Sequence, residues 1–363
     1  MKSLLSLLLL CGIAACLPQR PCPTVAYAAG GVHSVTVAVT ESLRIHAAAG
    51  RVPPTCSRNS SHTSYDAVDR ADAEIALAES IAADPTVVAV VGHLRSRGSL
   101  VAAPVYSRAG IPQIVPTGTS HQLRVAGPWT FVLAPSDSAQ AEFLVAEVAA
   151  SGARRVLLFY SGEEYGEGMA IPLRNALVAR QLVIVHEVRL GAGSDAPVLA
   201  EAAARRRDVD AAIILSDFRQ TGRIAKVLVA LRPALPLYAS DGAMYPQGLR
   251  QMAGAAAESI RIVSTWAPDT TNAATREFLA VFRELAGREP TPSEALGHDA
   301  LLYAHAAAVA VGPDRAGIRS WLAGQGGATP PHGAVTGATL HQRGAYPFTL
   351  TRIGPPPSSP APH

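Results

Sequence analysis

The sequence is poor in cysteine, in charged residues and in long apolar runs. Four cysteines in 363 residues are too few for a disulfide-stapled fold. Only the first 16 residues approach a continuous apolar run, and that run is too short to span a bilayer, which excludes a polytopic membrane protein. Charged residues make up 16% of the chain, and the basic ones are scattered beyond Arg205–Arg207, so a nucleic-acid-binding stripe is not supported. Hydrophobic residues make up 48%, which is enough to build folded cores.

The sequence also lacks the compact motifs of common enzymes. It contains no Gly-x-Ser-x-Gly elbow, no Gly-x-x-x-x-Gly-Lys loop and no His-Glu-x-x-His zinc motif. Its 11 histidines are dispersed without the spacing of metal ligands. We therefore expect no catalysis, no cofactor and no bound metal.

The first 16 residues are typical of a secretory signal that ends at a lipidation site. A positive start is followed by apolar Leu4–Leu10 and then by Ile13-Ala-Ala-Cys16. This arrangement resembles bacterial lipoproteins, and the resemblance implies cleavage before Cys16 and acylation of its thiol, which would anchor the mature protein to a bacterial membrane. The alternative is an ordinary signal peptide that is cleaved near Ala28-Ala29. In both cases we expect the mature chain to be extracytoplasmic.

Two cysteines are left once the signal peptide is set aside. Cys11 would be removed with the signal and Cys16 would carry lipid, so Cys22 and Cys56 remain. An even pair in an oxidising compartment is compatible with a disulfide. The alternative is two independent thiols in loose segments.

Between the ends of the chain, short apolar β-branched runs alternate with longer segments of helical period. Several short runs are apolar throughout, as expected for parallel strands that are buried on both faces. The predicted strands are Val35–Val39, Val87–Val91, Ile111–Val115, Val156–Tyr160, Leu182–Val188, Ala211–Leu215, Leu235–Ala239 and Ile260–Ser264. The predicted helices are Asp72–Ala83, Ser99–Arg108, Glu142–Ala150, Gly168–Ala179, Pro197–Arg206, Gln220–Leu231, Pro246–Met252, Asn272–Ala286, Ser293–Val311 and Arg315–Leu322.

This alternation predicts an α/β protein with doubly wound domains, and eight parallel strands fit two sheets better than one. Gly333–Leu340 and Tyr346–Arg352 are expected to form a final antiparallel pair. Residues 17–32 are rich in Pro, Ala and Gly and predict a tether. Residues 354–363 predict a disordered, proline-rich tail.

Polar loops follow four of the predicted strands. In open α/β sheets, ligands bind beyond the carboxyl ends of the strands, where loops meet helix N-termini. The loops at 92–99 and 116–120 offer hydroxyls and backbone N–H groups, which suit a carboxylate. The loop at 240–243 offers Asp241, which suits an ammonium, and the loop at 161–168 offers the amphipathic ring of Tyr165. Together the loops predict a site for an amino-acid-sized zwitterion, while each loop alone is also explained by turns and helix capping.

The ordered set of segments resembles the leucine/isoleucine/valine-type periplasmic binding proteins of bacteria. The likeness covers roughly residues 66–352. The segments that carry it are Val-Val-Gly-His-Leu-Arg-Ser at 90–96, Ala103–Pro112, Ile-Val-Pro-Thr-Gly-Thr at 114–119, Ala-Pro-Ser-Asp-Ser-Ala-Gln at 134–140, Tyr-Gly-Glu-Gly at 165–168, Leu-Ala-Gly-Arg-Glu-Pro at 285–290 and Gly-His-Asp-Ala at 297–300.

The resemblance implies the type I periplasmic binding protein fold, in which two Rossmann-like lobes are joined by three crossovers and close on a ligand between them. It places residues 33–136 and 263–325 in the first lobe, and residues 137–262 and 326–353 in the second. The region from Thr40 to Tyr65 departs from the family, because it is short and lacks the usual Asn-x-x-Gly-Gly segment.

The resemblance also implies roles for single residues. Ser96 and Thr119 would bind the carboxylate of the ligand, and the Gly118 backbone and Asp241 would take its ammonium. Tyr165 would cover the ligand from the second lobe. Further candidates for the cleft are Phe218, Asp217 and Arg95.

The function that follows from the resemblance is that of a lipid-anchored solute-binding protein of an ABC importer. It would deliver an amino acid or similar small polar solute to permease subunits by lobe closure. The alternative is a ligand-sensing or scaffold lipoprotein of the same fold that serves no transporter.

Overall fold

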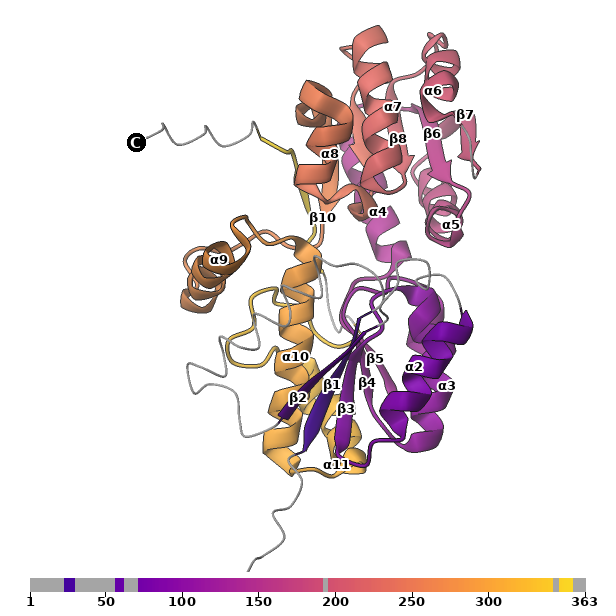
Figure 1. The fold of residues 1–363 in the computed structure, drawn as a ribbon. Helices are drawn as coiled ribbons and strands as arrows, with labels where there is room; N and C mark the ends of the chain where they lie inside the picture. Colours follow the sequence, from indigo (N-terminus) through magenta and orange to yellow (C-terminus); the bar gives the residue numbers. More distant parts are fainter. Residues whose placement is uncertain (1–22, 30–55, 62–70, 192–194, 342–345, 355–363) are drawn as a thin grey trace, which may run out of the picture.

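The computed structural model describes residues 23–29, 56–61, 71–191, 195–341 and 346–354. These residues form two lobes, each built on its own sheet (Figure 1). The predicted strand Val35–Val39, Cys16, Cys22 and the proline-rich tail after Gly354 lie outside the described residues.

The first lobe is built on a parallel sheet in the order β2-β1-β3-β4-β5. Helices cover both faces, so the central strand β3 is buried along its whole length. The strands are β1 (Thr24–Ala29), β2 (Cys56–Ser61), β3 (Val87–Gly92), β4 (Gln113–Val115) and β5 (Thr130–Val132). One face packs against α2 (Ala71–Ala82) and α3 (Ser96–Ala109), and the other against α10 (Pro292–Val311) and α11 (Arg315–Ala323).

The second lobe is built on a sheet in the order β11-β10-β9-β8-β6-β7, in which only β11 is antiparallel. Its strands are β6 (Arg155–Ser161), β7 (Val183–Leu190), β8 (Ala211–Leu215), β9 (Leu237–Ala239), β10 (Ile260–Ser264) and β11 (Thr349–Thr351). One face packs against α4 (Asp137–Ala150) and α5 (Glu164–Ala179), and the other against α6 (Ala196–Ala204), α7 (Phe218–Leu231) and α8 (Pro246–Ala253).

Five further helices complete the described part. They are η2 (His121–Val125), η3 (Asp241–Ala243), η4 (Gly254–Ser259), α9 (Ala273–Ala286) and α12 (Gln325–Ala328). Trp266 packs with Phe278 and Phe282 of α9 in a small satellite core beside α10.

The chain leaves the first sheet after β5, and α4 carries it from the junction into the second lobe (Figure 1). After β10 the chain returns to the first lobe, where α10 packs against the first sheet. It crosses again before β11, which pairs with β10. The connectivity matches the three crossovers that the family resemblance implies.

The seven predicted strands and ten predicted helices that lie among the described residues are present, with ends that differ by a few residues. The strands β1, β2 and β5 were not predicted. Residues 24–29 lie in the range expected to be a tether, yet they form the buried strand β1 between β2 and β3. The small residues Ala26 and Ala28 alternate with the larger Val25 and Tyr27, and the alanine content of the segment resembles linker composition.

The expected antiparallel pair near the C-terminus is wrong. Among the described residues of that region only β11 is a strand, and its partner is β10. Ala338 and Leu340 instead belong to the first-lobe core, and the His341 N–H donates to the Val132 carbonyl at 2.6 Å. The expected lobe boundary at 325/326 is therefore too early, since the first lobe extends to about residue 341.

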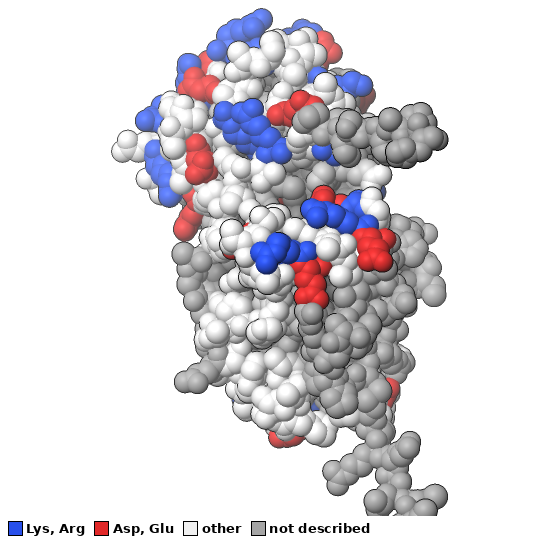
Figure 2. Space-filling model, turned by 90° about the vertical axis from the view of Figure 1, so that its left-hand side faces the viewer, with Lys and Arg blue, Asp and Glu red and all other residues white. Residues whose placement is uncertain are grey.

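The surface carries charges of both signs. In the view of Figure 2, basic and acidic residues are interspersed over the second lobe and at the level between the lobes, and the described surface below them is mostly uncharged. Among the described residues, no helix combines the length and apolar character needed to cross a membrane.

Candidate functional site

Two first-lobe loops predicted to bind a carboxylate lie in direct contact. Ser96 is the first residue of α3, and its Oγ accepts the backbone N–H of Ser120 at 3.2 Å. The Thr117 hydroxyl donates to the Leu94 carbonyl at 2.5 Å. These bonds join the β3–α3 loop to the loop after β4, so the two loops form one wall of polar groups.

Gly118 packs tightly against side chains on either side of it in the chain. A Cβ at this position would lie 2.5 Å from Cδ1 of Leu123, 2.8 Å from Cγ1 of Val115 and 3.5 Å from Oγ of Ser96. A larger residue would therefore displace the Leu123 and Val115 side chains of its own segment, while Ser96 of the other loop would stay in ordinary contact. The structure thus brings Ser96, Gly118 and Thr119 together, as predicted.

A buried polar cluster holds the β3–α3 loop from behind. His93 bonds through Nδ1 to the carboxylate of Glu74 and through Nε2 to the Tyr106 hydroxyl at 3.0 Å. The Ser99 hydroxyl donates to the His93 carbonyl at 2.8 Å. Because buried polar groups need partners, this cluster fixes the path of the loop that carries Ser96.

The two predicted residues of the second lobe also meet. The Tyr165 hydroxyl donates to Oδ1 of Asp241 at 2.5 Å and accepts the Gly242 N–H at 3.1 Å. Tyr165 lies in the first turn of α5, and Asp241 begins η3 after β9. Gly166 permits this turn, because a Cβ there would lie 2.2 Å from the Ser161 carbonyl oxygen.

The first turn of α4 links this first-lobe wall to the Tyr165–Asp241 pair of the second lobe. The Asp137 N–H donates to the Thr119 carbonyl at 3.0 Å, and the Asp241 N–H donates to Oε1 of Gln140 at 2.9 Å. Asp137 and Gln140 are both buried, and Oδ1 of Asp137 and Nε2 of Gln140 have no partner within the described residues. One helical turn rises about 5.4 Å, so the first-lobe loop and Asp241 are close neighbours.

Burial dominates the electrostatics of this junction. Desolvation raises the pKa of Asp137 to about 6, against the hydrogen bond from Thr119, and the nearby Asp241 adds to the rise. Desolvation also raises the pKa of Asp241, and the hydrogen bond from Tyr165 opposes that rise. Arg124 lowers the pKa of Asp137, so a protein cation already faces one of these two carboxyl groups.

Three further candidates take no part in these contacts. Phe218 begins α7 and stacks edge-on against Tyr245, with ring centroids 5.0 Å apart. Asp217 caps α7 by accepting the Gln220 N–H at 2.9 Å, and it pairs with Arg219. Arg95 is the exposed N-cap residue of α3.

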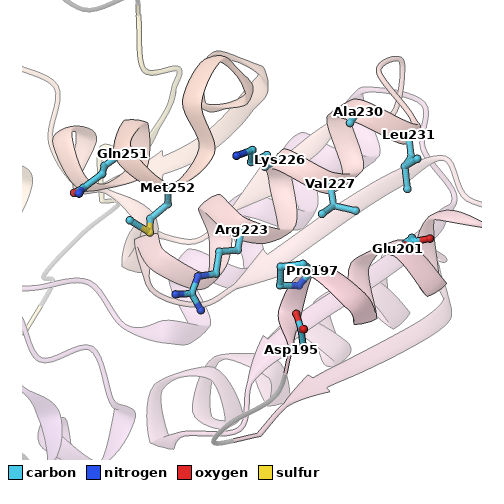
Figure 3. Close-up of a pocket in the computed structure, with 10 residues that line it drawn as sticks. All are labelled: Asp195, Pro197, Glu201, Arg223, Lys226, Val227, Ala230, Leu231, Gln251 and Met252. Atoms are coloured by element: carbon cyan, nitrogen blue, oxygen red, sulfur yellow. The ribbon is translucent and has the colours of Figure 1, made fainter.

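Other features of the described residues do not add a site at the junction. No group of three or more metal-ligating side chains occurs there or elsewhere in the described part of the chain. A groove between α6, α7 and α8 lies on the outer face of the second lobe (Figure 3). Its lining includes Pro197, Arg223, Lys226 and Met252, none of which belongs to the predicted loops.

Comparison with known proteins agrees with this architecture. A family model described as "Periplasmic binding protein" matches residues 58–354. The chain belongs to the periplasmic binding protein family. This match confirms the resemblance inferred from the sequence, and the fold is of type I. The family and its structural neighbours are solute-binding proteins and not enzymes, in agreement with the expectation.

Solved periplasmic binding proteins share the fold at low identity. A putative branched-chain amino acid ABC transporter from Rhodospirillum rubrum is 23% identical, with a TM-score of 0.67, over 91% of this chain and 98% of its own. LivJ from Streptococcus pneumoniae, solved with isoleucine, is 19% identical, with a TM-score of 0.72, over 87% and 99%. A solute-binding protein from R. palustris, solved with benzoate, is 16% identical, with a TM-score of 0.76, over 92% and 93%. No curated protein matches the chain.

Two residues at the junction of this periplasmic binding protein were missed as site residues. Asp137 and Gln140 lie in the Pro-Ser-Asp-Ser-Ala-Gln segment that carried part of the family resemblance. The segment was interpreted only as a crossing between lobes. Two polar residues three positions apart at the start of a helix lie on one face of it, and this spacing was the available indication that they belong to the site.

Proposed function

We propose that the protein is the extracytoplasmic solute-binding component of an ABC importer, and that its solute is an amino acid or a similar small polar molecule. The observation that carries this proposal is the link through the first turn of α4. It holds the hydroxyls and backbone N–H groups of the Ser96–Thr119 wall next to the carboxylate of Asp241.

The charge arrangement favours a zwitterion. Backbone N–H groups and hydroxyls near a helix start stabilise a carboxylate. Arg124 already lies near Asp137 and lowers its pKa, so the carboxylate left for a solute ammonium to pair with is that of Asp241. Structural neighbours bind either branched-chain amino acids or aromatic acids such as benzoate. The Asp241 carboxylate favours the amino-acid class.

Binding measurements on the full chain test the solute class. Thermal unfolding is followed with each of the common amino acids, with benzoate and with 4-hydroxybenzoate, and hits are confirmed by calorimetric titration. A solute at about 100 times its Kd adds about 2.7 kcal/mol of stability, which shifts the melting temperature measurably. The proposal expects stabilisation by at least one amino acid. Stabilisation by the aromatic acids alone would contradict it.

Transport is tested separately from binding. In the native cell, deletion of the gene should abolish high-affinity uptake of the solute identified by calorimetry, and the wild-type gene should restore it. Uptake that is unchanged in the deletion strain would favour the ligand-sensing or scaffold role. We further propose that Cys16 is the lipid anchor and that the lobes close on the solute.

A further inference from the structure

Tyr165 and Asp241 lie 76 positions apart and form one hydrogen-bonded unit in the second lobe. The Tyr165 hydroxyl donates to Oδ1 of Asp241 and accepts the N–H of Gly242. A phenolic hydroxyl has one hydrogen to donate, and that hydrogen is spent on the carboxylate. The hydroxyl is therefore committed to the Asp241 loop in the solute-free protein.

The Tyr165 ring is also pressed against this loop. A Cβ on Gly242 would lie 2.8 Å from Cε1 of Tyr165 and 2.8 Å from the Ser216 carbonyl oxygen. The absence of a side chain at Gly242 thus lets the ring approach the backbone. On the other side, Gln140 accepts the Asp241 N–H, so the aspartate is held from α5 and from α4.

We propose that Tyr165 is a positioning residue for Asp241. The Tyr165 hydroxyl fixes the Asp241 carboxylate in orientation and in its ionised form. This role is separate from covering the solute with the ring. A hydrogen bond to an ionised acceptor is roughly twice as strong as a neutral one. A carboxylate has about four lone-pair sites, so the bond from Tyr165 leaves acceptor capacity for an ammonium.

The surroundings make this help necessary. Burial raises the pKa of Asp241, and the Tyr165 hydrogen bond opposes the rise. Asp241 in turn raises the pKa of Tyr165 on α5, of Asp137 on α4 and of Tyr346 before β11, so these titratable groups lie near it. The charge of Asp137 disfavours a second negative charge beside it. Without the Tyr165 hydroxyl, less would oppose the effects of burial and of Asp137 on the pKa of Asp241. Asp241 would therefore hold its proton to higher pH.

The first test measures the Asp241 carboxyl directly in the solute-free full chain. Carbon-13 NMR of aspartate-labelled protein follows the titration, and Asp241→Asn assigns the signal. In Tyr165→Phe, which keeps the ring, the midpoint should rise by roughly one pH unit or more. The control Tyr160→Phe removes a hydroxyl from β6, where the ring lies under Arg174, and should leave the midpoint unchanged. Equal midpoints in wild type and Tyr165→Phe would overturn the inference.

The second test rests on the proposed function, because it uses binding of L-leucine or of the panel amino acid that binds most tightly. Calorimetric titrations are run between about pH 5 and pH 8. In Tyr165→Phe the affinity should fall about tenfold per pH unit below the raised Asp241 midpoint. The affinity of the wild type should stay constant to a lower pH. A uniform loss at every pH would show a covering role only and would overturn the inference. Failure of the wild type to bind any amino acid would instead refute the proposed function, and the NMR titration would still decide this inference.

Discussion

The backbone N–H of Asp137 donates to the carbonyl of Thr119 at 3.0 Å. This bond ties the first residue of α4, which leads into the second lobe, to the loop predicted to bind the solute carboxylate. Burial raises the pKa of the Asp137 side chain to about 6, so this carboxyl changes charge in a mildly acidic range. The same residue thus couples the connection between the lobes to protonation.

Asp137→Asn should make the protein less sensitive to pH. The native state holds the Asp137 proton up to about pH 6, whereas the unfolded state releases it near pH 4, so the contribution of this group to stability falls as pH rises between these values. A shift of about two units corresponds to roughly 3 kcal/mol. Urea unfolding should show that the stability of Asp137→Asn relative to wild type increases by up to about that amount from pH 4 to pH 7. A constant difference over this range would contradict the prediction.

The fold was predictable where periodicity is strong. Apolar β-branched runs such as Ala211–Leu215 and Ile260–Ser264 match their strands to the residue, because burial on both faces leaves a continuous apolar pattern. β1 is rich in alanine and resembles a linker, and β2, Cys-Ser-Arg-Asn-Ser-Ser, contains no apolar run. Their identity as strands depends on neighbours that are distant in the sequence.

The site was predictable only in part, for a related reason. Ser96, Gly118, Thr119, Tyr165 and Asp241 follow strands, and the carboxyl ends of parallel strands share one edge of the sheet. Phe218 also follows a strand, yet its ring packs on Tyr245, since the direction of a side chain depends on the helix beside it. Asp137 and Gln140 follow the crossing between lobes, so their role emerges only when both lobes are placed.

Arg315 should stabilise the first lobe. Its guanidinium donates to three backbone carbonyls, those of Val87 at 2.8 Å, Ala109 at 3.1 Å and Asp84 at 3.3 Å. Arg315→Lys cannot reproduce the planar fork, so we expect a loss of about 2 kcal/mol in the free energy of unfolding. Arg319→Lys on the same helix is the control. Arg319 donates one exposed hydrogen bond to the Pro128 carbonyl and lies over the Trp129 ring at 6.0 Å, where a lysine can keep the cation, so this change should cost less than about 0.5 kcal/mol. Equal losses in chemical denaturation would contradict this role.

Cys16→Ser should release the protein from membranes or leave its signal uncleaved. The thiol of Cys16 is the predicted attachment point of lipid, and a serine hydroxyl does not replace it. Membrane fractionation and the mass of the mature chain check this prediction. Cys11→Ser is the matched control, since Cys11 lies within the segment expected to be removed. Unchanged fractionation and mass in Cys16→Ser would refute the lipid anchor.

Solute should bring the lobes together. The chain passes between the sheets at few points, and such connections permit hinge motion of packed lobes. Small-angle X-ray scattering should therefore give a smaller radius of gyration when the protein is saturated with the amino acid identified by calorimetry. Identical curves under conditions of verified saturation would contradict closure.

Asp241→Ala should abolish binding of an amino-acid solute. A buried ammonium–carboxylate pair is strongly coupled, and removal of one partner typically costs about 3–5 kcal/mol, which is more than a hundredfold in Kd. Ser96→Ala should cost less, because it frees the Ser120 N–H, which donates to Ser96 Oγ in the solute-free protein, to bind the carboxylate. The control is Asp208→Ala, which removes an aspartate that pairs with Arg206 at the surface of the same lobe and should leave Kd unchanged. If calorimetry shows that Asp241→Ala binds as wild type does, Asp241 holds only the η3 turn, and the ammonium of the solute must be bound elsewhere.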